Sequence, residues 1–247
     1  MSASRSVLVT GSAGTIGRAV CSELIACGHH VRRLDRLPTP HVDGSVVCDL
    51  LEPAQIRSAL EGIDTVVHLA ATPGEADFMT KLLPNNIIAV YQLLDAARDA
   101  GIRNVILTSS TQVNMADMQH LPYTTDMLLR PRNWYSVTKA FGEAAGRMCS
   151  DVHGMNVLIV RPGGCPWDKA QLSVFENSAF NKNIYLSARD AGRFYACAVA
   201  AIERIRFAIL YATSKPYKET VSDINAAAEL IGYLPEDIWP QGTELLE

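Results

Sequence analysis

The stretch TGSAGTIG at residues 10–17 follows directly on the apolar run VLV at residues 7–9. The apolar run predicts a short buried strand, and apolar residues at three- and four-residue spacing over residues 16–25 predict a helix. A glycine-rich turn between a strand and a helix is typical of sites that hold the pyrophosphate of a dinucleotide, although a lone match can also be no more than a tight turn. The stretch therefore predicts a strand–turn–helix and points to a nucleotide cofactor.

The three glycines of this stretch have separate expected roles. Gly11 permits the tight turn, Gly14 lets the backbone approach a pyrophosphate without a Cβ in the way, and Gly17 lets the helix pack closely on the sheet. Backbone N–H groups at the start of the helix, where Thr15 and Ile16 stand, would face the phosphates. These five residues are therefore expected to bind the cofactor.

The next apolar segment ends in a carboxylate. Asp35 lies 18 residues beyond Gly17. A carboxylate at this place can accept hydrogen bonds from the adenosine ribose and would repel a 2′-phosphate, which favours NAD over NADP. Neighbouring arginines weaken this preference because one of them could accommodate the phosphate, namely Arg32, Arg33 or Arg36.

Two further strands, expected over residues 45–48 and 65–67, end in residues that suit a cofactor site. Small residues after the second strand leave room for a ligand. His68 at the same strand end is expected to be buried and hydrogen-bonded within the strand rather than to act as a ligand or base. The candidate cofactor-binding residues at these two strand ends are Asp49, Leu50, Leu69, Ala70 and Ala71.

The second informative stretch is YSVTK at residues 135–139, which opens a helical pattern. Tyr135 and Lys139 are four residues apart and so project from one face of that helix. We expect the ammonium, together with the positive nicotinamide of an oxidised cofactor, to lower the pKa of the phenol from about 10. The phenolate would then take the proton of a substrate hydroxyl while hydride leaves the same carbon.

A serine completes this constellation. Ser110 follows a strand expected over residues 104–107 and stands on the usual ligand side of such sheets. Its hydroxyl would hold the substrate oxygen and stabilise developing charge. A tyrosine–lysine pair at this spacing is also common by chance on helix surfaces. The glycine stretch upstream and the serine at a strand end make the catalytic interpretation the stronger one.

The chain has 247 residues, of which 48% are apolar, and this length suffices for one large domain with a full core. Strands alternate with helical patterns, which predicts an α/β fold with a doubly wound parallel sheet. We expect a single Rossmann-type domain over residues 1–247, with a dinucleotide-binding core roughly over residues 1–161 and a small substrate-binding portion roughly over residues 162–247. In the latter we expect a strand over residues 207–211, a helix over residues 223–231, and a helix capped by Asp190.

Composition excludes several classes of function. A net charge of −4 gives no electrostatic reason to bind nucleic acid or an anionic membrane. No apolar stretch approaches the roughly 20 residues that a membrane span needs. The six cysteines show no metal-ligand spacing, so no metal site is expected. Free thiols and the lack of a signal segment before the first strand predict a cytoplasmic protein.

Taken together, these motifs resemble the short-chain dehydrogenase/reductase superfamily, in its extended, epimerase/dehydratase-like branch. The most similar group is the uronate dehydrogenases, whose pattern is matched by YSVTKAFGE at residues 135–143, VRPGGCP at residues 160–166 and YLSARD at residues 185–190. The resemblance implies an NAD-binding Rossmann fold and a dimer formed through helices at residues 82–100 and 135–150. It also implies the catalytic residues Ser110, Tyr135, Lys139 and Asn86, with Lys139 also binding the nicotinamide ribose.

Uronate dehydrogenases oxidise C1 of a hexuronic acid to a lactone with NAD, and this chain departs from their pattern around the substrate. Only 86 residues follow Arg161, fewer than the larger substrate domain for a nucleotide-sugar usually needs, so a small sugar or sugar acid is the expected substrate. Thr111 and Gln112 stand where the group has Asn-His, and only Lys182 is cationic where an arginine would clamp a carboxylate. By position, the candidate substrate-binding residues are Thr72, Ser110, Thr111, Gln112, Gly163 and Cys165, with Pro73 and Trp167 beside them.

Three functions remain open at this point. The first is an NAD-dependent oxidoreductase acting on a CH–OH group of a small sugar or sugar acid. The second is a sugar epimerase or dehydratase that retains its NAD, although Thr111 replaces the acidic residue that dehydratases of this branch usually carry. The third is a non-catalytic NAD-binding sensor, which would not need the pair Tyr135 and Lys139.

Overall fold

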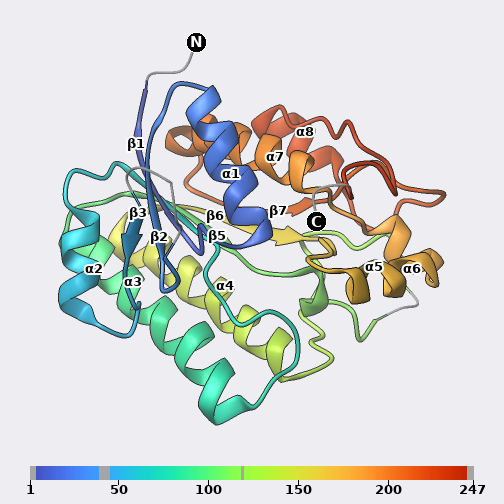
Figure 1. Ribbon diagram of the computed structural model, residues 1–247, viewed down its shortest axis with the longest axis horizontal. Coiled ribbons are helices and arrows are strands. Elements are labelled where there is room, and N and C mark those ends of the chain that lie inside the picture. The colour runs from blue at the N-terminus through green and yellow to red at the C-terminus, as the bar shows by residue number, and fades with distance from the viewer. Residues whose placement is uncertain (1–3, 39–44, 118–119, 244–247) are drawn as a thin grey trace.

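The computed structural model describes residues 4–38, 45–117 and 120–243 (Figure 1). The two chain ends, and with them the expected domain limits at residues 1 and 247, lie outside the described residues. A seven-stranded sheet in the order β3-β2-β1-β4-β5-β6-β7 forms the centre, and neighbouring strands pair in parallel throughout. The predicted doubly wound parallel sheet is confirmed.

The strands lie close to where the apolar runs predict them. Their bounds are β1 (Ser6–Thr10), β2 (His30–Asp35), β3 (Ser45–Val47), β4 (Thr65–His68), β5 (Asn104–Thr108), β6 (Asn156–Pro162) and β7 (Phe207–Ala212).

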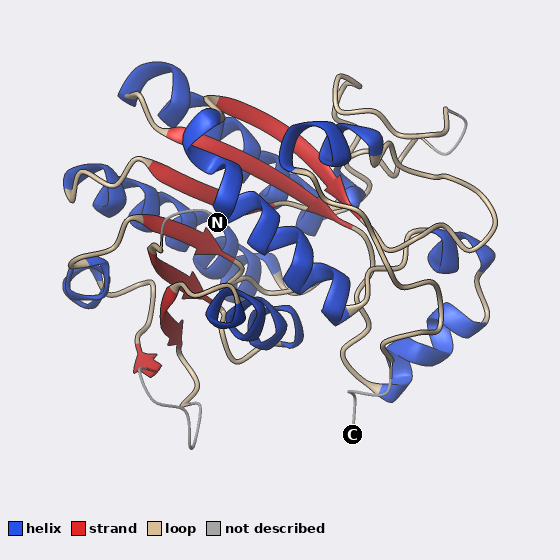
Figure 2. Ribbon diagram, turned by 90° about the horizontal axis from the view of Figure 1, so that it is seen from above, coloured by secondary structure: helices blue, strands red, loops and turns tan. Residues whose placement is uncertain are grey.

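Helices connect the strands and cover both faces of the sheet (Figure 2). The α-helices described are α1 (Thr15–Ala26), α2 (Pro53–Leu60), α3 (Ala89–Asp99), α4 (Trp134–His153), α5 (Lys169–Glu176), α6 (Ala179–Asn183), α7 (Ala188–Ala201) and α8 (Asn225–Ile231). A π-helix, η1 (Phe78–Ile88), runs into α3, and single 3₁₀ turns form η2 (Thr111–Val113) and η3 (Ile202–Arg204). No helix among these residues is long and apolar enough to cross a bilayer.

Alternation along the central strand divides the core in two. Val7 and Val9 are fully buried with α1, α7 and α8 on one face of the sheet. Leu8 is buried with α2, α3 and the carboxyl end of α4 on the other. Because side chains of a strand point alternately to opposite faces, a strand covered on both sides is apolar throughout. The run VLV at residues 7–9 therefore fixes β1 in the middle of the sheet.

Local capping fixes where α4 begins and ends. Asn133 accepts a hydrogen bond from the backbone N–H of Ser136, and Ser136 in turn accepts from the N–H of Asn133, which is a reciprocal capping box. Gly154 ends the helix at φ +77°, a conformation that favours glycine. At Gly146 a Cβ would come within 2.9 Å of the side chains of Ile159 and Leu107, so the glycine lets α4 lie close to the sheet.

The region after β6 is richer in structure than the sequence predicts, because α5 and α6 precede α7. The expected cap of α7 is also wrong. The N-cap is Ser187, whose Oγ accepts a hydrogen bond from the backbone N–H of Asp190. Asp190 lies in the first turn of the helix and is fully buried. Its carboxylate accepts hydrogen bonds from Ser214 Oγ at 2.6 Å and from the backbone N–H groups of Glu236 and Asp237 at 2.9 and 3.0 Å.

Asp190 therefore ties α7 to the segment over residues 233–243. The same segment packs against α5, because the Trp239 ring stacks on Phe175 with centroids 5.5 Å apart. The Tyr185 hydroxyl donates to the Gln241 carbonyl at 2.9 Å. The segment therefore packs against α5 and against the residues that lead into α7.

We expect Asp190→Ala to lower the free energy of unfolding by about 3 kcal/mol, because it leaves several buried donors unpaired. Urea denaturation followed by circular dichroism measures the loss. Asp95→Ala is the control, because Asp95 pairs with Arg98 at 2.7 Å on an exposed helix face, where such pairs contribute less than about 1 kcal/mol. Equal losses in the two variants would contradict the tethering role of Asp190.

Candidate active site

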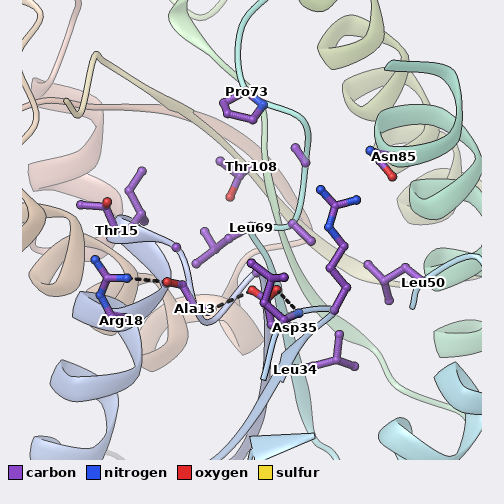
Figure 3. Close-up of a pocket in the computed structure, with 18 of the residues that line it drawn as sticks. Ala13, Thr15, Arg18, Leu34, Asp35, Leu50, Leu69, Pro73, Asn85 and Thr108 are labelled. Carbon is purple, nitrogen blue, oxygen red and sulfur yellow. Dashed lines mark hydrogen bonds between the residues drawn. The ribbon is translucent and has the colours of Figure 1, made fainter. Parts of the chain in front are cut away.

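A cavity of about 540 Å³ opens at the carboxyl ends of the central strands (Figure 3). Asp35 and Leu34 lie at one end, and Thr108 and Pro73 lie at the other. The cavity is lined by the residues that the glycine stretch and the ends of three predicted strands indicate as cofactor-binding. These are Gly11, Gly14, Thr15, Ile16, Gly17, Asp35, Asp49, Leu50, Leu69, Ala70 and Ala71.

The glycine turn fits a pyrophosphate. A Cβ on Gly17 would lie 2.1 Å from the Gly11 carbonyl oxygen, so no larger residue fits there. Gly11 has φ +71°, and a Cβ on it would lie 2.7 Å from the backbone nitrogen of Ala70. No side chain caps the first turn of α1. Its backbone N–H groups and the positive end of the helix dipole are thus available to phosphate oxygens.

Asp35 is held in place by the backbone around it. One carboxylate oxygen accepts from the N–H of Ala13 and the other from the N–H of Leu37, both at 3.0 Å. Each oxygen keeps a lone pair, so the carboxylate can also accept from ribose hydroxyls. Arg18 and Arg36 line the same cavity and bring positive charge to it.

Ser110, Tyr135 and Lys139 come together beside Thr108, where β5 ends. All three are buried, with 6%, 8% and 8% of their surfaces exposed. The Ser110 hydroxyl hydrogen-bonds the phenol of Tyr135. The Lys139 ammonium donates to the Thr108 carbonyl at 3.0 Å and lies 5.8 Å from the centre of the Tyr135 ring.

The expected lowering of the Tyr135 pKa is wrong for the protein itself. Burial raises the pKa of this phenol to about 12, and the hydrogen bond from Ser110 offsets only part of that rise. Burial also lowers the pKa of Lys139 to about 8. The ammonium points at a backbone carbonyl and the ring rather than at the phenol oxygen, so desolvation outweighs its attraction for a phenolate.

His68 confirms the structural interpretation of the sequence. It is 3% exposed, and its Nδ1 lies 2.8 Å from Thr10 Oγ1 in the adjacent strand. Burial, with a smaller contribution from the nearby Lys139, lowers the pKa of His68 to about 3. The imidazole is therefore neutral at physiological pH.

Asn86 is 2% exposed and links two parts of the site. Its Oδ1 accepts from the backbone N–H of Thr72 at 2.8 Å, and its Nδ2 donates to the Thr72 carbonyl and to Thr138 Oγ1, both at 3.1 Å. The amide thus ties the loop after β4 to α4. Asn85, which the sequence analysis does not nominate, lines the cavity and donates to Thr72 Oγ1 at 2.8 Å.

Of the residues nominated for the substrate, Cys165 lines the cavity, whereas Thr111, Gln112 and Gly163 are not among its lining residues. Cys165 lines the cavity together with Pro73 and Trp167. Gln112 is half-buried, and its side-chain oxygen accepts from Asn133 at 3.2 Å. Thr111 is 3% exposed. A Cβ on Gly163 would lie 1.9 Å from the Ile184 carbonyl oxygen, so close packing requires this glycine.

Sequence reasoning missed Glu75, whose carboxylate accepts the backbone N–H of Tyr135 at 3.1 Å. An acidic side chain at the amino end of a helix is stabilised by the helix dipole. No local pattern connects residues 60 positions apart, so only the fold reveals this contact.

Lys182, the cation expected near a substrate carboxylate, lies 5.5 Å from the centre of the Tyr217 ring. Within the described ranges no group of three or more His, Cys, Asp or Glu side chains could hold a metal ion.

A pH-dependent stability difference follows from the buried ammonium. Because the pKa of Lys139 falls from 10.5 to about 8 on folding, the unfolded chain binds more protons between these pH values, and stability rises with pH there. Relative to Lys139→Met, the free energy of unfolding of the unaltered chain should rise by about 3 kcal/mol from pH 8 to pH 10.5. Urea denaturation of both proteins across this range measures the difference; a difference that stays constant would mean that the ammonium is well solvated.

The model of the NAD dependent epimerase/dehydratase family matches residues 7–164. An NAD-dependent glucose-6-phosphate dehydrogenase of Haloferax volcanii is 30% identical over 94% of this chain and 93% of its own length. A uronate dehydrogenase of Agrobacterium fabrum is 33% identical over 64% of this chain and 61% of that protein. Among solved structures, a mutated uronate dehydrogenase superposes with a TM-score of 0.80 at 26% identity, covering 95% of this chain and 82% of that chain.

Proposed function

The chain belongs to the NAD dependent epimerase/dehydratase family, and we propose that it is an NAD-dependent dehydrogenase of a small sugar or sugar acid. The observation that carries the proposal is the meeting of Ser110, Tyr135 and Lys139 beside Thr108, which lines the cavity of the glycine turn. A dehydrogenase needs a proton acceptor next to the carbon that loses hydride, and this arrangement provides one.

When bound in this cavity, NAD⁺ supplies the hydride acceptor and a positive charge. Tyr135 would act as a phenolate, a form that the positive charge of bound NAD⁺ would favour over the neutral phenol of the protein alone; the phenolate takes the proton of the substrate hydroxyl, and Ser110 donates a hydrogen bond to the same oxygen. Lys139 keeps positive charge over the phenol ring, which lowers the cost of forming a phenolate there. In the opposite direction the protonated phenol is the proton donor.

The uncharged residues of the cavity and the place of Lys182 support a proposal for the class of substrate. Besides the residues of the expected cofactor site, the cavity is lined by the uncharged residues Pro73, Asn85, Cys165 and Trp167. Lys182, the cation expected near a substrate carboxylate, lies over the Tyr217 ring. These features support recognition of sugar hydroxyl groups; the resemblance to uronate dehydrogenases supports oxidation at C1 to a lactone. Both the relatives reported above carry names of sugar dehydrogenases.

We further infer that the chain acts as a homodimer. Large apolar side chains are exposed on one side of α4, including Trp134 at 61% and Met148 at 46%, and Tyr91 on α3 is 59% exposed. Exposed apolar groups of this size favour contact with another protein surface.

The six free cysteines suit a reducing compartment, which supports the cytoplasm as the location of the protein. Residues roughly 162–247 would form the substrate-binding portion.

The direct test is NADH formation by purified protein with NAD and a panel of neutral aldoses, hexuronates and sugar phosphates. We expect turnover with at least one aldose or hexuronate, and slower turnover when NADP replaces NAD, because Asp35 would repel the 2′-phosphate. NAD retained through purification without net NADH would favour an epimerase instead. NAD binding without turnover of any sugar would contradict the proposed activity.

We expect Tyr135→Phe to lower kcat about 1,000-fold, because the variant has no group to take the proton. The affinity for NAD, measured by fluorescence titration, should change less than about twofold, because the ring still packs in place. Tyr233→Phe is the matched control: this phenol is also buried, but it donates to the Thr213 carbonyl, outside the site. Undiminished turnover in Tyr135→Phe would remove the assigned base.

A further inference from the structure

A fully buried ion pair lies between α4 and the sheet. Glu143 is 5% exposed and Arg161, on β6, is 1% exposed. Two parallel hydrogen bonds join them, from Arg161 Nε to Glu143 Oε1 and from Nη2 to Oε2, both at 2.8 Å. Burying two charges costs free energy that their attraction returns only in part, so such a pair adds little to stability. Its presence in the core therefore points to a role in geometry.

One end of the pair reaches the residues assigned to proton transfer. Ser109 Oγ donates to Glu143 Oε1 at 2.6 Å, and Ser109 directly precedes Ser110. Glu143 lies four residues beyond Lys139 and eight beyond Tyr135, so the three side chains share one face of α4. The carboxylate thus joins the strand end that carries Ser110 to the helix face that carries the phenol.

The other end reaches the turn next to the expected substrate-binding residues. Arg161 Nη1 donates to the Tyr211 hydroxyl at 3.0 Å, across the register that pairs these two residues in β6 and β7. The Tyr211 hydroxyl donates in turn to Asn114 Oδ1 at 3.1 Å. The backbone N–H of Asn114 donates to the Thr111 carbonyl at 3.2 Å. The position of η2, which holds Thr111 and Gln112, is therefore linked to the ion pair.

We propose that Glu143 and Arg161 are positioning residues that set two alignments at once: Ser110 against Tyr135 through Ser109, and the η2 turn against the site through Tyr211. This inference rests on the proposed function. It predicts that the two alignments can be loosened separately. The Ser109 link acts on the proton-transfer groups, whereas the Tyr211 link acts on substrate binding.

The test compares Ser109→Ala and Tyr211→Phe in the full chain at saturating NAD, with the sugar that gives the fastest turnover. Ser109→Ala should lower kcat about tenfold and change KM less than about twofold, because small misplacements of reacting groups cost rate. Tyr211→Phe should raise KM about tenfold and change kcat less than about twofold. Ser109→Thr, which keeps the hydroxyl, should restore kcat to within about threefold of the unaltered chain.

Two controls remove a buried hydroxyl of the same kind outside this network. Ser150→Ala acts on the same helix, where Ser150 Oγ donates to the Arg206 carbonyl at 2.9 Å. Tyr233→Phe removes the phenol that donates to the Thr213 carbonyl at 2.9 Å. Both should lower the melting temperature as the test variants do, yet leave kcat and KM within about twofold. A purely structural role would make all four variants behave alike.

Hydrogen exchange tests the network without turnover. In Tyr211→Phe, the amides of residues 111–117 should exchange about tenfold faster than in Tyr233→Phe, while those of α4 stay unchanged. Unchanged exchange over residues 111–117 would overturn the inference, as would equal effects of Ser109→Ala and Tyr211→Phe on kcat and KM. An unaltered chain that oxidises no sugar would instead contradict the proposed function, so the two failures are distinguishable.

Discussion

The site depends on one constraint: all seven strands run in the same direction, so their carboxyl ends meet along one edge of the sheet. Gly11, Asp35 and Thr108 follow or end three different strands, and they line one cavity for that reason. A parallel sheet must be covered on both faces, so central strands such as β1 are apolar along their length and present polar groups chiefly at their ends. The chemistry therefore lies at the edge, and the stability comes from the two layers beneath it.

Much of this could be predicted from the sequence, and the reasons are local. The glycine stretch marks close contacts that no Cβ permits, as the 2.1 Å approach to the Gly11 carbonyl shows. Tyr135 and Lys139 share a helix face because four residues make about one turn. The buried state of His68 follows from its place in an apolar strand.

The rest could not be predicted because it arises from tertiary packing. The pKa of Tyr135 rises because the folded chain excludes water from the phenol, and no spacing in the sequence encodes that burial. Aspartate is a residue type that often caps helices, but the Asp190 carboxylate accepts a hydrogen bond from the backbone of Glu236, 46 residues away. Glu75 reaches α4 from a loop 60 residues earlier. In each case a local preference yields to a contact that only the assembled fold provides.

The segment over residues 233–243 also has a consequence for synthesis. The strands that surround the glycine turn, β1 to β5, are complete once residue 108 has been made. Trp239 and Gln241, near the end of the described residues, contact Phe175 and Tyr185, which follow the loop carrying Cys165 and Trp167. Domains fold as units, and α7 and α8 cover the face of the sheet on which α1 packs, so the strands at the glycine turn are synthesised long before the residues that complete the layer over them.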